Sequence, residues 1–290
     1  MTSPHALFKI IIQLTNAFNT EIDGVIKQKD IEHLHRLRVT SRRLRTVLRT
    51  CKPLLSPQKY NYYQKHIRAV TRSLGHARDL DTQIMFLQTI HLPAPAGIYR
   101  KGIDTLLHTL HTQRSHAQPA VKKAIKVIRK KKILSTLTKE ILAVPACTAL
   151  AVQAAHTHIQ SCVKKLTTYH AIADKPHQII ELHHMRIAAK HLRYCLENAH
   201  ELLPTPTMIY IRQARLLQRT LGDMHNYHLW RTRITAVDTR SSIQERLVSG
   251  HIHRICTQKE KDAYNRFLQA WTEQEKAGTW KHLLAECLSQ

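Results

Sequence analysis

An internal duplication constrains this chain more than any other feature of its sequence. The segment HRLRVTSRRLR begins at His35 and HHMRIAAKHLR begins at His183, so both follow H-x-x-R-φ-x-x-[RK]-x-L-R at an offset of 148. A second pattern, three basic residues at helical spacing followed by Leu-Gly, ends at Gly75 and again at Gly222. Since 45 of the 290 residues are Lys or Arg, a chance match has odds on the order of 10⁻³ even with the offset freely chosen. The chain therefore consists of two related halves.

The composition predicts an all-α protein. Only seven glycines and ten prolines punctuate a chain that is 43% hydrophobic, and the stretches between them favour Leu, Ala, Lys, Arg, Gln and His at helical spacing. We expect helices near residues 5–29, 31–51, 58–76, 79–91, 99–116 and 120–142, and then near 147–172, 177–202, 206–221, 225–237, 242–256 and 258–287. The boundary between the halves is expected near Pro145, without a Gly/Ser-rich linker. Two antiparallel helical bundles, about 5–144 and 145–287, are predicted to pack as one unit.

The net charge of +25 points to a polyanionic partner, because self-repulsion on this scale opposes compaction. Nucleic acid, inorganic polyphosphate, an anionic membrane surface and an acidic protein are all candidates. The six cysteines form no C-x-x-C pair, which favours a reducing cytosol over a disulfide framework. We expect no membrane insertion, because the most apolar stretch is too short to span a bilayer.

The repeated basic residues form stripes beside apolar faces. At about 100° per residue, a helix places His35, Arg38, Arg42 and Arg45 within one arc, next to the arc of Leu34 and its apolar neighbours. The second copy of the motif, and the two helices that carry the Leu-Gly pairs, also place their basic residues on one arc beside an apolar arc. Four matched stripes with few carboxylates nearby predict one shared anion-binding surface, although a single stripe would be typical of a solvated face. The basic segment 122–132 has no clear repeat partner and fits either a solvated face or an auxiliary patch.

Other residues near the motifs have simpler expected roles. We predict that Gly75 and Gly222 end helices with positive φ, and that Asp79 or Asn226 starts the helix that follows. For His35 and His183, a role as ligand donor and a structural hydrogen bond are equally consistent with the sequence.

Little in the sequence points to catalysis or to a metal. Asp79, Asp81 and Asp223 are the candidate carboxylates near the motifs, and helix capping is their expected role. There is no G-x-x-x-x-G-K-[ST] loop, H-E-x-x-H motif or nucleophile elbow. The x-H-x-H pairs at 33/35, 156/158 and 251/253 do not place both imidazoles on one helix face. We therefore expect no metal site from these pairs.

The two motif copies, together with LGHARDLD and LGDMHN, resemble the CHAD domain over about residues 5–287. The resemblance implies two pseudo-symmetric antiparallel four-helix bundles around a basic central cavity that binds inorganic polyphosphate. Family members often accompany a CYTH triphosphatase domain with an E-x-E-x-K strand, which is absent here. The implied binding residues are His35, Arg38, Arg42, Arg45, Lys65, Arg68 and Arg72 in the first half, and His183, Arg186, Lys190, Arg193, Arg212, Arg215 and Arg219 in the second.

The sequence thus predicts a cytoplasmic, noncatalytic polyphosphate-binding protein without a cofactor. Its expected partners are the polymer, polyphosphate granules and the enzymes that make or degrade polyphosphate. The main alternative is nonspecific RNA or DNA binding, although the aromatic content of 6% offers few stacking platforms. A metal-dependent polyphosphate or triphosphate hydrolase is a weaker alternative. Inward-facing stripes would favour a thin polymer, and outward-facing stripes would favour a duplex.

Overall fold

The structure, a computed structural model, describes residues 6–93, 96–143, 148–200, 207–235 and 243–288. Every regular element within these ranges is helical, which confirms the all-α prediction. The first half contains α1 (Ala6–Lys27), α2 (Ile31–Thr50), α3 (Pro57–Gln88), α4 (Ala96–Lys130) and α5 (Ile133–Leu142). The second half contains α6 (Thr148–Thr167), α7 (Ile179–Ala199), α8 (Thr207–Thr235), α9 (Ile243–Lys276) and α10 (Thr279–Leu288). Short 3₁₀ turns, Lys52–Leu54 and His170–Ile172, follow α2 and α6.

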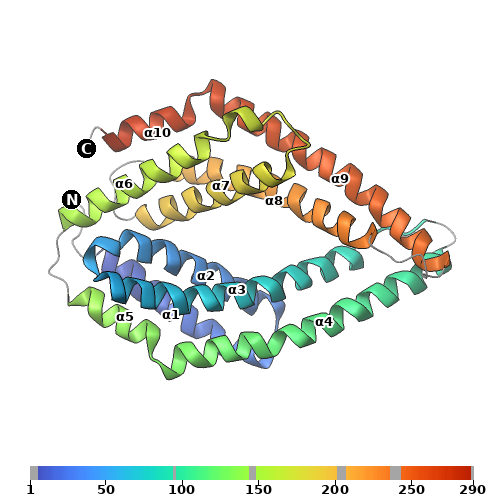
Figure 1. The fold of residues 1–290 in the computed structure, drawn as a ribbon, viewed down its shortest axis with the longest axis horizontal. Coiled ribbons are helices and arrows are strands. Elements are labelled where there is room, and N and C mark those ends of the chain that lie inside the picture. Colours follow the sequence, from blue (N-terminus) through green and yellow to red (C-terminus); the bar gives the residue numbers. More distant parts are fainter. Residues whose placement is uncertain (1–5, 94–95, 144–147, 201–206, 236–242, 289–290) are drawn as a thin grey trace.

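The two halves use the same helix pairings. In the first half, α1 packs on α2, α2 on α3 and α3 on α4, while α5 returns to α1. In the second half, α6 packs on α7, α7 on α8 and α8 on α9, while α10 returns to α6. Figure 1 shows the halves one above the other, with α2 and α3 facing α7 and α8 across the middle. The halves contact each other through α2 with α7 and α6, and through α4 with α9.

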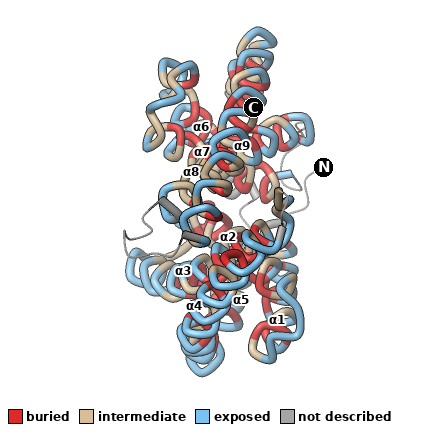
Figure 2. Tube along the Cα trace, turned by 90° about the vertical axis from the view of Figure 1, so that its right-hand side faces the viewer, coloured by how far each residue is buried: buried red, intermediate tan, exposed pale blue. Residues whose placement is uncertain are grey.

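The apolar faces predicted from helical spacing form the core. Leu34, Leu37, Leu44 and Leu48 of α2 are each at most 2% exposed. The corresponding face of α7 is buried as well, including Met185, Leu192 and Leu196. Burial of each such side chain stabilises the fold by about 1.5–3 kcal/mol. Figure 2 shows these buried positions running along the helices of both halves, and the basic stripes are thereby fixed beside them.

Helix starts follow their sequence signals. The carboxylate of Asp30 accepts the backbone N–H of Glu32 at 3.1 Å and caps α2. The hydroxyl of Ser56 accepts the N–H of Lys59 at 3.4 Å, and Pro57 occupies the first turn of α3. Both caps satisfy donors that a helix leaves unpaired at its N-terminus.

Several predicted helix ends are wrong. Gly75 and Gly222 lie inside α3 and α8, and the one described glycine with positive φ is Gly278, between α9 and α10. Pro119 also lies inside a helix, α4. Each half therefore has five described α-helices rather than the six expected. Tertiary packing outweighs the cost of about 1 kcal/mol for a glycine within a helix, since Leu74 and Leu221 beside them are buried. The predicted boundary at Pro145 lies outside the described residues.

Candidate anion-binding site

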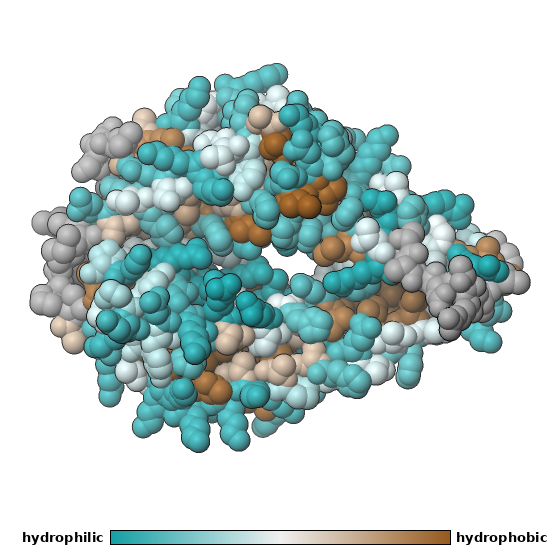
Figure 3. Space-filling model, viewed as in Figure 1, coloured by the Kyte–Doolittle hydropathy of each residue, from teal (hydrophilic) through white to brown (hydrophobic). Residues whose placement is uncertain are grey.

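A basic cavity lies between the two halves. It has a volume of about 620 Å³ and is lined from α2, α3 and α7. A second cavity of about 640 Å³ adjoins it along α2 and α3. Figure 3 shows an opening between the halves, with hydrophilic side chains gathered beside it. The charged groups that line the two cavities are Arg38, Arg42, Arg45, Arg49, Lys65, Arg68, Arg72 and Lys190, together with one carboxylate, Asp79.

The first-half stripes point into this cavity because of their spacing. On α2, Arg38, Arg42 and Arg45 follow the i, i+4, i+7 pattern, which keeps them on one helix face. Their neighbours Leu37 and Leu44 are buried against the core, so the arginines emerge at its border. The prediction that the basic stripe borders the buried stripe is confirmed for α2.

Cations from both halves converge in the cavity. Burial lowers the pKa of Arg38 to about 10, and the neighbouring charges of Arg42 and Arg186 add to the effect. Burial and the same arginine neighbours lower the pKa of Lys190 to about 7. The pKa of Arg186 is lowered by burial and then by Arg42 of the other half. The fold therefore brings positive charges together in a partly dehydrated space. An anion bound there would offset their mutual repulsion.

Several guanidinium donors in this region have no partner among the described residues. The Nε atoms of Arg38, Arg45 and Arg186 are buried and make no hydrogen bond. Buried donors are normally paired with protein groups, water or an ion, so these groups are available to an acceptor that enters the region. Arg38 has one carboxylate nearby, Asp79, at 3.7 Å between Nη2 and Oδ1. That carboxylate is 66% exposed and leaves Nε free for another acceptor.

The repeated Leu-Gly pairs lie against the repeated arginines. A Cβ added at Gly75 would lie 3.8 Å from Nε of Arg38, and one added at Gly222 would lie 3.4 Å from Nε of Arg186, both ordinary van der Waals contacts. Each glycine therefore faces the first arginine of the motif in its own half. The predicted helix-ending role is wrong, because both glycines lie inside continuous helices.

The motif histidines lie beside the cavity rather than in its lining. Burial is the first cause that lowers the pKa of His35, followed by the charge of Arg78. Burial and then Arg186 lower the pKa of His183 to about 4, and its Nδ1 lies 3.1 Å from Nδ1 of His225. Both rings are held largely neutral near pH 7 and serve as hydrogen-bonding groups.

The second-half stripes contribute less than predicted. Among the described lining residues, Lys190 is the one predicted second-half cation present. Glu197 lies 3.4 Å from Nε of Arg193 and 3.1 Å from Nη2 of Arg215. Glu197 occupies the position that corresponds to Arg49 in the first half. Its carboxylate neutralises positive charge on Arg193 and Arg215, whereas Arg49 adds positive charge to the first-half stripe. Arg186 does not line either cavity, but its charge acts on Lys190 beside it. Arg212 and Arg219 are exposed on α8 and do not line the cavity.

Several lining residues are absent from the predicted binding set, Arg49, His191 and Tyr194 among them. Arg49 continues the α2 stripe and lines both cavities, a position that its spacing from Arg45 signals but the repeat does not. His191 and Tyr194 of α7 also line the cavity. Their inclusion depends on α7 packing against α2, for which the sequence carries no direct signal.

The carboxylates near the motifs do not cap helices. Asp79 and Asp81 lie inside α3, and Asp223 and Asn226 lie inside α8, so the capping prediction is wrong because the helices do not break at the glycines. Asp81 is 5% exposed and forms an ion pair of 2.7 Å with Arg114 of α4. This pair is structural and does not line the cavity.

The other predicted features are distributed over the surface and core. The lysines of the segment 122–132 are exposed, while Val121, Ile125 and Ile128 bury the opposite face, as in a solvated helix. In the x-H-x-H pair at 33/35 the two rings diverge as predicted, since Nδ1 of His33 pairs with Glu21 at 2.7 Å while His35 borders the cavity. Among the described residues, no helix is both long and apolar enough to cross a bilayer.

Comparison with known proteins identifies the family. The CHAD domain family matches residues 9–235, whereas curated protein sequences give no match. The crystal structure of the CHAD domain from the plant Ricinus communis is 21% identical, with a TM-score of 0.69 over 92% of this chain and 91% of that one. PptA from Streptomyces chartreusis is 16% identical, with a TM-score of 0.67 over 94% of this chain and 100% of that one. These two structures share the fold, and the family match spans well over half of the sequence. The chain belongs to the CHAD domain family.

Proposed function

We propose that the protein binds inorganic polyphosphate noncatalytically in the basic cavity between its halves. The CHAD family is associated with polyphosphate in general, and the chain's own residues supply the specific argument. A linear polymer with closely spaced phosphates would pass along α2 and α3 and contact Lys190 of α7. Association with polyphosphate granules or with enzymes of polyphosphate metabolism follows as the proposed cellular context.

The convergence of unpaired arginine donors carries this proposal. Arg38, Arg45 and Arg186 keep buried Nε donors without a hydrogen-bond partner among the described residues. Dehydrated cations cost free energy in the unbound protein. Phosphate oxygens would pair with these donors through charge-assisted hydrogen bonds, the strongest class available to Arg. Binding would thus offset an energetic cost that the fold itself creates.

The inward direction of the stripes favours a thin chain over a duplex. The cavity lies between the halves and is partly enclosed by α2, α3 and α7. Tyr60 and Tyr194 are the aromatic residues among its described lining, and they do not form a series on which successive bases would stack. Backbone phosphates of single-stranded RNA remain the closest competitor, because they carry the same charge.

A noncatalytic role is supported by how the nearby carboxylates are used. Asp79 is the carboxylate among the described lining residues, and it lies within 3.7 Å of Arg38. Asp81 is paired with Arg114 outside the cavity. Metal-assisted phosphoryl transfer needs carboxylates directed at the phosphates to hold the ion. We therefore propose that the polymer is held and not cleaved.

A charge-reversal pair tests this function. Arg42→Glu combined with Arg186→Glu places carboxylates on both sides of the cavity, so binding of labelled long-chain polyphosphate should be lost while helicity measured by circular dichroism is retained. The matched control is Lys122→Glu with Lys126→Glu, which makes the same charge change on the exposed face of α4. Equal losses in the two double variants would show that net charge alone governs binding and would contradict a site in the cavity.

A further inference from the structure

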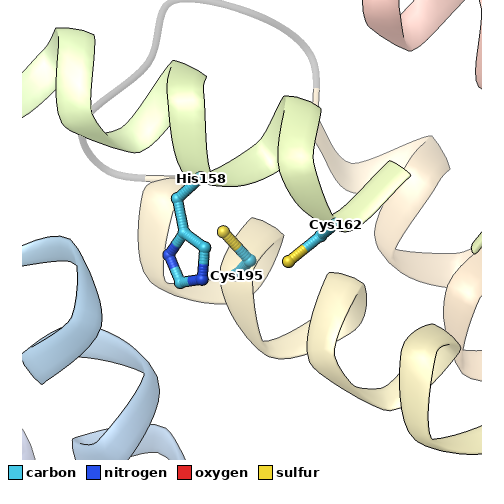
Figure 4. A group of neighbouring side chains, drawn as sticks. All are labelled: His158, Cys162 and Cys195. Atoms are coloured by element: carbon cyan, nitrogen blue, oxygen red, sulfur yellow. The ribbon is translucent and has the colours of Figure 1, made fainter. Parts of the chain in front are cut away.

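A cluster of metal-ligating side chains lies outside the basic cavity. His158 and Cys162 are four residues apart on α6, and Cys195 extends toward them from α7 (Figure 4). One ring nitrogen of His158 and the two sulfur atoms all lie within 4.8 Å of one another. Spacing of i and i+4 places two ligands on one helix face, and the packing of α7 on α6 supplies the third.

The histidine is already oriented for a ligand role. Nδ1 of His158 lies 3.2 Å from the hydroxyl oxygen of Thr50 on α2. Figure 4 shows one ring nitrogen directed toward α2, drawn in blue, and the other on the side of the sulfurs. The Thr50 hydroxyl can accept a hydrogen bond from Nδ1–H, and in that tautomer Nε2 keeps a free lone pair, the arrangement usual for a metal-bound histidine.

The two thiols are placed as ligands and shielded from solvent. Both cysteines are buried and free of disulfides, and Cys162 is 9% exposed. The thiolate is the form of cysteine that binds metals. In a tetrahedral zinc site, ligand atoms lie about 3.5–3.8 Å apart, as follows from Zn–S of about 2.3 Å and Zn–N of about 2.0 Å. Small side-chain rotations would bring the three ligand atoms, which lie within 4.8 Å of one another, to that separation.

We propose that His158, Cys162 and Cys195 bind one zinc ion. Two thiols lose their protons, so the two thiolates balance the charge of Zn²⁺, while the imidazole binds as the neutral ring. Sulfur and imidazole ligands match zinc rather than Mg²⁺ or Ca²⁺, which take oxygen ligands. The ion would join α6 to α7 and, through the Thr50 contact, brace both against α2. The site is independent of the proposed polyphosphate function, although Arg49 next to it also lines the basic cavity.

Metal substitution tests this site in the full chain. The reduced, metal-free protein is titrated with Co²⁺, which reports thiolate ligation through a sulfur-to-metal charge-transfer band, and the bound Co²⁺ is then displaced with Zn²⁺. We expect one Co²⁺ per chain with a thiolate band that Zn²⁺ removes. Cys195→Ser should weaken or abolish the band. The matched control is Cys256→Ser, which alters another buried free cysteine on α9 and should leave the titration unchanged.

A third variant keeps the test decisive if Cys195→Ser fails to fold. His158→Ala alters the one ligand that is not fully buried and should reduce zinc affinity at least tenfold, measured by competition with a chromophoric chelator, with unchanged circular dichroism. Absence of a thiolate band in the wild-type protein would overturn the proposal. Equal zinc affinity in His158→Ala and Cys256→Ser would overturn it as well.

Discussion

Lys190 should make anion binding depend on pH near neutrality. Burial, followed by the charges of Arg42 and Arg186, lowers its pKa to about 7 in the unbound protein. A bound polyanion favours the charged ammonium, so the pKa rises on binding and the complex takes up a proton. Below pH 7 the lysine is already charged and affinity changes little. Above pH 7 affinity falls, because the lysine must first be protonated.

The size of the effect follows from that pKa. At pH 8 about one lysine in ten is charged in the unbound protein, which weakens binding about tenfold, or about 1.4 kcal/mol. Lys190→Arg removes this cost, because an arginine stays charged even where burial lowers its pKa to about 10, as at Arg38 and Arg45. The variant should therefore bind polyphosphate about tenfold more tightly than the wild type at pH 8 and about equally at pH 6.

Fluorescence anisotropy with labelled polyphosphate, at constant ionic strength and at pH 6, 7 and 8, measures this difference. Burial lowers the pKa of His183 to about 4 and that of His191 to about 3. His76 also lines the cavity but is the same in both proteins, so the difference between Lys190→Arg and the wild type reports the lysine. The control is Lys65→Arg, the same replacement at an exposed lysine that lines the second cavity, which should keep the wild-type profile. An identical pH slope in Lys190→Arg and the wild type would refute the reasoning.

Three further predictions concern the site and its support. Arg68→Ala removes a cavity cation and should weaken polyphosphate binding about tenfold or more. Arg215→Ala should change binding less than about threefold, because Glu197 already pairs with Arg215. Titration of both variants with labelled polyphosphate measures the difference. Asp81→Ala should lower the free energy of unfolding by about 3 kcal/mol, since it leaves the partly buried Arg114 with Gln118 in place of an anionic partner; a loss below about 1 kcal/mol in urea denaturation would contradict this. Polyphosphate at about 100 times its Kd should stabilise the folded protein by about 2.7 kcal/mol; an unchanged Tm would contradict specific binding to the folded state.

The sequence predicted the helical faces well because each face depends on local spacing. Leu37 and Leu44 are buried and Arg38 borders them, as a helix of 3.6 residues per turn requires. The glycines were misread for the opposite reason. Gly75 and Gly222 lie inside continuous helices and face arginines of a neighbouring helix, and the sequence around a glycine does not state which side chain lies against it.

The candidate site was predicted in part, because its two halves are unequal. Repetition implies equal roles for both copies, yet Glu197 pairs with Arg193 and Arg215, and Arg212 and Arg219 of α8 lie on the exposed surface. The sequence shows that Glu197 stands where the first half has Arg49. It does not show that the Glu197 carboxylate also contacts Arg215 on α8. The cluster of His158, Cys162 and Cys195 was missed for the same reason, since Cys195 joins the other two only through the packing of α7 on α6.

Competition among polyanions tests the central proposal most directly. Labelled long-chain polyphosphate bound to the wild-type protein at near-physiological salt is displaced with unlabelled polyphosphate, single-stranded RNA or duplex DNA at equal phosphate concentration. A partly enclosed cavity lined by arginines predicts efficient displacement by polyphosphate and weak displacement by RNA and DNA. Equal or better displacement by either nucleic acid would contradict a dedicated polyphosphate site and identify the basic cavity as a nucleic-acid-binding surface.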